Sequence, residues 1–101
     1  LAAKTFAEEN FRRPIEVVDM ARASGMSRFH FTRQFNRHLG EMPSRFLLRL
    51  RVREAARLLR DPKRSIKEVS YECSFKDPSH FSKVFRRETG SSPADFRKSG
   101  L

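Results

Sequence analysis

Several residue types that define other classes of protein are scarce in this sequence. It has one cysteine, Cys73, no tryptophan, four glycines and five prolines in 101 residues. A single cysteine excludes an intrachain disulfide framework and fits a reducing compartment. No apolar run approaches the roughly 20 residues that cross a membrane, and no signal peptide opens the chain. These absences predict a cytoplasmic location.

Acidic residues are also few, 12 against 22 basic ones, and the net charge is +10. The excess is uneven. Residues 1–27 include four basic and four acidic residues. Residues 28–60 include nine basic and two acidic residues, and residues 61–101 include nine basic and six acidic residues. A solvated surface mixes signs, so the middle segment predicts a contact face for a polyanion. Charge alone does not separate DNA from RNA or anionic lipid.

What is present indicates helices. Apolar residues recur every three or four positions, proline and glycine fall between segments, and alternating strand-like runs are absent. The prediction is an all-α fold of seven helices, built on a thin aromatic core with ten phenylalanines. The expected helices cover residues 2–10, 15–23 with Pro14 in the first turn, 28–39 after a Ser27 cap, 43–60, 66–73 after a Ser65 cap, 77–89, and a short stretch from Pro93.

Two stretches of the chain, residues 26–46 and 75–96, align as internal copies. With an offset of 50, the shared positions are His30, Phe31, Phe35, Arg37, Gly40, Pro43 and Phe46 in the first copy and His80, Phe81, Phe85, Arg87, Gly90, Pro93 and Phe96 in the second. Upstream the offset is 49, so the one-residue change falls in a turn, where an insertion costs least. Each copy predicts helix, tight turn, helix. The expected domains are a helix-turn-helix subdomain over residues 1–42, a linker helix over 43–60, and a second such subdomain over 61–101.

The second helix of each copy is predicted to contact DNA. At 100° per residue, the phenylalanines shared by the copies face inward and a polar, cationic face points outward. Such a face fits a major groove, where Arg donates to guanine, Asn pairs with adenine and an apolar group meets a thymine methyl. The candidates for base reading are Phe29, Thr32, Arg33 and Asn36 in the first copy, and Ser79, Ser82, Lys83 and Arg86 in the second. Exposed helix faces are commonly polar in any protein, but an outward Phe29 has little structural reason to be there.

Some phosphate contacts are expected near helix starts, where free N–H groups and the positive end of the dipole attract anions. Residues near such starts are Ser27, Arg28, His30, Ser44, Arg45, Ser79 and His80. The full set of phosphate candidates is Ser27, Arg28, His30, Arg37, Ser44, Arg45, Arg49 and Arg87. His30 and His80 occupy matched positions, and packing beside the turn with a bond to the backbone is an equal alternative for both. Most other arginines of the linker helix, among them Arg51, Arg53, Arg57 and Arg60, are expected to face solvent.

A set of spaced residues in each copy carries a family resemblance. In the second copy they are Ser65, Ile66, Val69, Cys73, Phe75, Ser79, His80, Phe81, Val84, Phe85, Arg86, Gly90, Ser92, Pro93, Phe96 and Arg97, and in the first Met20, Ala21, Gly25, Met26, Ser27, His30, Phe35 and Gly40. Together they resemble the DNA-binding domain of the AraC/XylS family of bacterial transcription regulators, over nearly the whole chain. The sequence departs from the family pattern at Ser74, where Gly is usual, and at Ser70 and Glu72, where small apolar residues are usual. A Cβ at a left-handed position costs about 1 kcal/mol, so a strained second turn is expected.

The resemblance implies two recognition helices on one rod, placed in successive major grooves. It adds His80 to the base-reading residues and implies three partners: double-stranded DNA, RNA polymerase, and a sensing or dimerising domain of the parent protein outside this chain. Any effector binds outside these residues, and the location it implies is the nucleoid of the cytoplasm. The operator, the effector, and activation against repression stay open.

Three other functions explain these residues less well. The positive charge would suffice for an architectural DNA-coating protein, but that function leaves the outward Phe29 unexplained. RNA recognition generally uses exposed aromatic platforms, whereas most phenylalanines here have core phases. Catalysis is disfavoured because the one Cys and three His form no nucleophile and base pattern, and no metal spacing such as CxxC or HExxH occurs. We therefore predict a sequence-specific DNA-binding protein with no catalytic residue, metal or cofactor.

Overall fold

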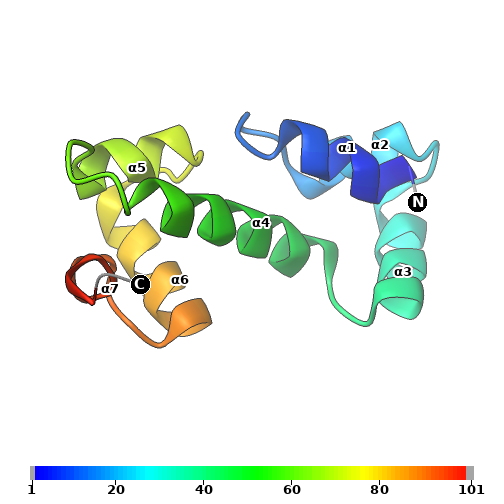
Figure 1. Cartoon of the computed structure of the whole chain (residues 1–101). Coiled ribbons are helices and arrows are strands. Elements are labelled where there is room, and N and C mark those ends of the chain that lie inside the picture. The colour runs from blue at the N-terminus through cyan, green and yellow to red at the C-terminus, as the bar shows by residue number, and fades with distance from the viewer. Residues whose placement is uncertain (1, 100–101) are drawn as a thin grey trace. The chain divides into compact units, whose positions relative to one another are not determined.

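The computed structural model describes residues 2–99, and all of its regular structure is helical (Figure 1). The seven helices are α1 (Ala2–Asn10), α2 (Val17–Ala23), α3 (Arg28–Leu39), α4 (Pro43–Leu58), α5 (Ile66–Glu72), α6 (Pro78–Thr89) and α7 (Pro93–Lys98). The predicted all-α class and helix order are confirmed. None of the helices in residues 2–99 has the length and apolar character to cross a bilayer.

Two helix boundaries differ from the prediction by two residues, and the end of α5 and the start of α6 differ by one. Pro14 is exposed and lies before α2, which begins at Val17 because Glu16 and Asp19 form a reciprocal capping box there. The long helix α4 ends at Leu58 instead of Arg60, and a turn follows before Pro62. The predicted caps are confirmed, since Ser27 and Ser65 accept the N–H groups of His30 and Glu68.

The chain divides into two compact units, Leu1–Leu50 (unit 1) and Arg51–Leu101 (unit 2). The boundary falls inside α4, so this helix supplies residues to both units. The expected division into residues 1–42, 43–60 and 61–101 stays a prediction.

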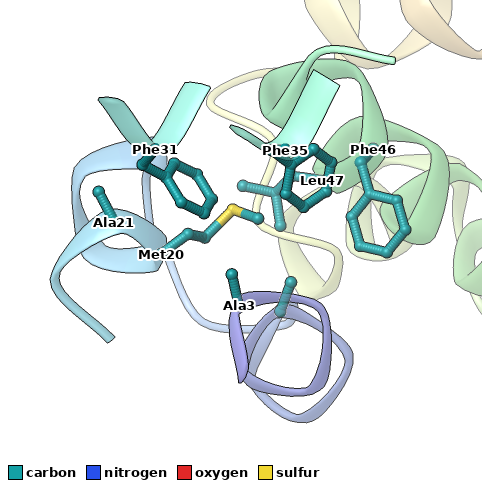
Figure 2. Close-up of a cluster of buried hydrophobic side chains, with 8 residues drawn as sticks. Ala3, Met20, Ala21, Phe31, Phe35, Phe46 and Leu47 are labelled. Atoms are coloured by element: carbon teal, nitrogen blue, oxygen red, sulfur yellow. The ribbon is translucent and has the colours of Figure 1, made fainter. Parts of the chain in front are cut away.

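Unit 1 is held together by a small aromatic core (Figure 2). Met20 projects from α2 toward Phe31 and Phe35 of α3, and Ala3 of α1 lies below it. Met20 is completely buried, and Phe35 is 1% exposed. The Phe35 ring meets the Phe31 ring at 5.5 Å and the Phe46 ring at 5.3 Å between centroids. Packing against α1, α2 and α4 therefore fixes which face of α3 is turned away from the core.

Unit 2 repeats this core with matching rings. Phe81 and Phe85 of α6 are fully buried, and their centroids lie 5.5 Å apart. Phe85 meets Phe96 of α7 at 5.3 Å, as Phe35 meets Phe46 in unit 1. An additional ring, Phe75, packs on Phe81 at 5.0 Å. The repeat seen in the sequence is thus a repeat of side-chain packing.

The turns between the paired helices also match. Gly25 and Ser74 both adopt left-handed backbone, with φ of 67° and 63°. After each of them, the next residue donates its N–H to a carbonyl five positions back, Met26 to Ala21 at 3.1 Å and Phe75 to Ser70 at 3.0 Å. This is the bond pattern that closes a helix on a left-handed residue. The expected strained position at Ser74 is therefore present in the structure.

Candidate nucleic-acid interface

Helix α3 presents four of the predicted base-reading residues on the side away from the core of unit 1. Phe29 is 73% exposed, although it is a large apolar residue. Arg33 and Asn36 are exposed, and Thr32 is half-buried. Phe31 and Phe35 anchor the opposite side of the helix, so these four residues form the outward face of α3. His38, whose helical phase lies beside the buried phenylalanines, is exposed as well.

Phe29 and Arg33 lie one helical turn apart and interact with one another. The Arg33 guanidinium carbon lies 5.7 Å from the centroid of the Phe29 ring. This distance lies within the range of about 6 Å in which a cation is attracted to an aromatic ring. The pair therefore presents a positively charged donor beside an apolar ring.

A hollow of about 490 Å³ opens beside this pair, between the starts of α2, α3 and α4. It brings together predicted DNA contacts from two separate segments: Arg28, Phe29, Thr32 and Arg33 of α3, and Ser44 of α4. Met42 also lines it and is 48% exposed. The predicted contacts of unit 1 near the start of α3 thus share one surface.

The arginines predicted to bind phosphates around α4 differ in their surroundings. Arg49 is committed to a bidentate ion pair, with its Nε and Nη2 atoms 3.1 and 2.7 Å from the two carboxylate oxygens of Glu41. Arg37 and Arg45 are exposed. Sequence reasoning missed the role of Glu41, because a pair eight residues apart across a turn has no periodic signal. A phosphate at Arg49 would therefore compete with this carboxylate for the same guanidinium.

Helix α6 of unit 2 has the corresponding arrangement. Phe81, Val84 and Phe85 are buried, and the opposite side carries the remaining predicted contacts. Ser79, His80, Lys83, Arg86 and Arg87 are exposed, and Ser82 is half-buried. Asp77 caps the helix by accepting the N–H of His80 at 2.7 Å. Arg87 lies 3.4 Å from Glu88, a weak ion pair that a phosphate can replace.

The two matched histidines have the same backbone role and different ring environments. Each donates its backbone N–H to the capping side chain at the helix start, His30 to Ser27 and His80 to Asp77. Both residues are exposed. The His80 ring also lies 5.9 Å from the Phe75 ring, which places it against the turn of unit 2. For His80, packing beside the turn and contact with DNA are therefore compatible.

Two arginines of unit 2 have structural roles. Arg97 donates from Nε to the carbonyl of Leu59 at 2.9 Å and from Nη2 to the carbonyl of Arg64 at 2.5 Å, so it joins the end of α4 to the following loop. Arg51 was expected to face solvent but is only 8% exposed. Burial lowers the pKa of its guanidinium, and Cys73 acts in the opposite direction. Neither residue belongs to the outward face of α6.

Residues 2–99 contain no group of three or more His, Cys, Asp or Glu side chains that could hold an ion. Cys73 is buried and not disulfide-bonded. Both outward faces expose hydrogen-bond donors and positive charge, and the face of α3 also exposes the Phe29 ring.

Comparison with known proteins gives one consistent match. The family described as "Helix-turn-helix domain" matches residues 20–99. The HTH-type transcriptional activator RhaS of Salmonella schwarzengrund is 40% identical over 91 residues, which is 90% of this chain and 33% of that protein. The chain therefore spans about a third of the length of the curated relatives it matches.

Solved structures agree with the sequence match. A transcriptional regulator from Chromobacterium violaceum, described as containing an AraC-type DNA-binding domain, superimposes with a TM-score of 0.88 at 31% identity, covering 99% of this chain and 89% of that one. The DNA-binding domain of AdpA, a global transcriptional factor solved with a target DNA, gives a TM-score of 0.89 at 35% identity and covers 96% of this chain and 87% of that one.

Proposed function

The chain belongs to the AraC/XylS family of helix-turn-helix DNA-binding domains, and we propose that it regulates bacterial transcription by binding a specific double-stranded DNA sequence. Its two units insert α3 and α6 into successive major grooves, which lie about 34 Å apart along a duplex. The single observation that carries this proposal is the matched pair of exposed cationic helix faces, each held by the same buried phenylalanine pair.

Base reading is assigned to the outward faces. Arg33 donates to guanine from its position beside the Phe29 ring, and Phe29 offers an apolar contact to a thymine methyl. Asn36, one turn further along α3, reaches an adenine. The base-reading residues of unit 1 are Phe29, Thr32, Arg33 and Asn36. Those of unit 2 are Ser79, His80, Ser82, Lys83 and Arg86.

Phosphate binding is assigned to side chains at helix starts and at the edges of these faces. The set is Ser27, Arg28, His30, Arg37, Ser44, Arg45, Arg49 and Arg87. Such contacts fix the position of the protein on the duplex without reading sequence. Within this set Arg49 differs, since the Glu41 carboxylate occupies its guanidinium in the free protein.

The rest of the regulator is proposed from its relatives. Because the chain spans about a third of the curated relatives, a sensing or dimerising domain is assigned to a part of the parent protein outside these residues. The matched relatives are transcriptional activators, so contact with RNA polymerase is the proposed output. A nucleoid location in the cytoplasm and the absence of catalysis belong to the same proposal.

The decisive experiment selects bound fragments from a random duplex pool and then compares affinities at one physiological salt concentration. We expect the selected site to bind at least about a thousandfold more tightly than scrambled DNA of the same length. Equal affinities would refute sequence-specific binding. That result, together with a steep salt dependence, would identify an architectural DNA-coating protein instead.

A pair of variants separates base reading from phosphate binding. Arg33→Ala should cost about 1 to 3 kcal/mol on the selected site and relax the preference at one base pair. Arg45→Ala should weaken all duplexes alike and reduce the salt slope by about one. Identical behaviour of the two variants would contradict the assignment of roles.

A further inference from the structure

The hollow beside α3 has a mainly apolar lining. Val17, Met42 and Pro43 line it together with the ring of Phe29. Phe29 and Met42 are 73% and 48% exposed, so a bound molecule could remove much apolar surface from water. The volume of about 490 Å³ lies in the range of about 300 to 1,000 Å³ that is usual for small-molecule sites.

The other residues that line the hollow are cationic or polar. They are Arg28, Thr32, Arg33 and Ser44. Among the eight described residues that line the hollow there is no acidic side chain. Arginine binds a carboxylate through two parallel N–H donors, so the lining offers partners for one carboxylate beside apolar side chains that fit an apolar body.

The repeat provides an internal comparison for these residues. Unit 2 carries Pro78, Ser79 and Ser92 where unit 1 carries Arg28, Phe29 and Met42. Both units nevertheless have the same helix starts, ring packing and left-handed closing glycines. The helix-turn-helix fold therefore does not require an arginine, a phenylalanine or a methionine at these positions.

We propose that the hollow binds a small amphipathic anion, a molecule with a flat apolar body and one carboxylate, and that this ligand and DNA exclude one another. Phe29, Thr32 and Arg33 line the hollow and are also proposed to read bases, so one surface cannot serve both at once. The exclusion rests on the proposed DNA-binding function, whereas ligand binding does not. Such a ligand weakens DNA binding from within the DNA-binding domain itself.

Titration of the whole chain with 2-naphthoate, followed by amide and methyl NMR, tests the site. We expect saturable shifts confined to the hollow, above all at Phe29, Ser44 and the Met42 methyl group. The neutral isostere 2-naphthamide should bind about tenfold more weakly, because it loses the charge-assisted bonds to arginine. Equal binding of the two compounds, or shifts spread over exposed arginines of both units, would overturn the proposal.

A matched pair of variants tests the apolar lining of the hollow. Met42→Ser introduces the residue that unit 2 carries at this position, and it should weaken naphthoate binding about fivefold or more. Val18→Ser changes another apolar side chain, 38% exposed, that does not line the hollow, and it should leave binding unchanged. An equal effect of both substitutions would show general hydrophobic binding and refute the site.

Competition on the selected duplex tests the exclusion. At ten times its own Kd, naphthoate should raise the apparent Kd for DNA about elevenfold, as mutually exclusive binding requires. Met42→Ser should bind DNA like the wild type and resist this inhibition. DNA affinity unchanged at saturating naphthoate overturns the exclusion, and a failure to bind any duplex selectively without naphthoate overturns the proposed function alone.

Discussion

Ser74 and Gly25 are counterparts in the two turns, and exchanging their side chains measures backbone strain. Ser74 adopts a φ of 63° and Gly25 a φ of 67°. A residue with a Cβ in this region costs about 1 to 2 kcal/mol relative to right-handed backbone. Glycine, however, gives the unfolded chain more conformational freedom, which lowers the stability of a glycine variant by about 0.4 to 1 kcal/mol. The difference leaves a net strain of roughly 1 kcal/mol at Ser74.

Three variants isolate this strain. Ser74→Ala and Ser74→Gly both remove the hydroxyl and differ only in the Cβ, so the glycine variant should be more stable than the alanine variant by about 1 kcal/mol. Gly25→Ala should lower stability by a similar amount. A Cβ built on Gly25 meets no atom within 4 Å, so its cost is conformational alone.

Urea unfolding followed by circular dichroism measures these differences, with amide exchange at Met26 and Phe75 as a local report on each turn. In thermal unfolding of a domain of this size, a difference of about 1 kcal/mol in stability corresponds to a shift of about 4 to 8 °C in Tm. Equal midpoints for Gly and Ala at position 74 would refute the reasoning, because the backbone there could not then be held in the left-handed region.

Three further changes test single contacts. Arg97→Met removes a guanidinium that joins the end of α4 to the next loop, and it should lower the free energy of unfolding in urea by about 2 to 3 kcal/mol. Lys98→Ala, a change at an exposed neighbour, should lower it by less than about 0.5 kcal/mol. Equal losses would contradict the structural role of Arg97. Asp77→Ala removes the cap of α6 and should cost about 1 kcal/mol in thermal unfolding, and an unchanged Tm would deny the cap a stabilising role. Glu41→Gln releases Arg49 and should tighten binding about two- to fivefold on selected and scrambled duplexes alike, measured by fluorescence anisotropy. A gain on only one of the duplexes would argue against a phosphate contact.

The fold of this chain could be predicted because its signals are local. Ser27 and Ser65 cap helices through bonds to N–H groups three residues away, and Gly40 and Gly90 end helices in left-handed conformation. The start of α2 was missed because proline is a common first helical residue, and the capping box of Glu16 and Asp19 competes with that signal. Apart from His80, which the family resemblance added, the residues of both outward faces followed from helical phase, since the phenylalanine pair of each helix marks its inner side.

The sequence by itself determined the helices, the repeat and the identity of the two outward faces, because these depend on spacings of three and four residues and on residues adjacent to each turn. Only the tertiary structure decided which of these side chains work together. The hollow joins α2, α3 and α4, Glu41 holds Arg49 eight residues away, and Arg97 reaches a carbonyl 38 residues before it. Such contacts arise from the packing of separate helices, and no period along the chain encodes them.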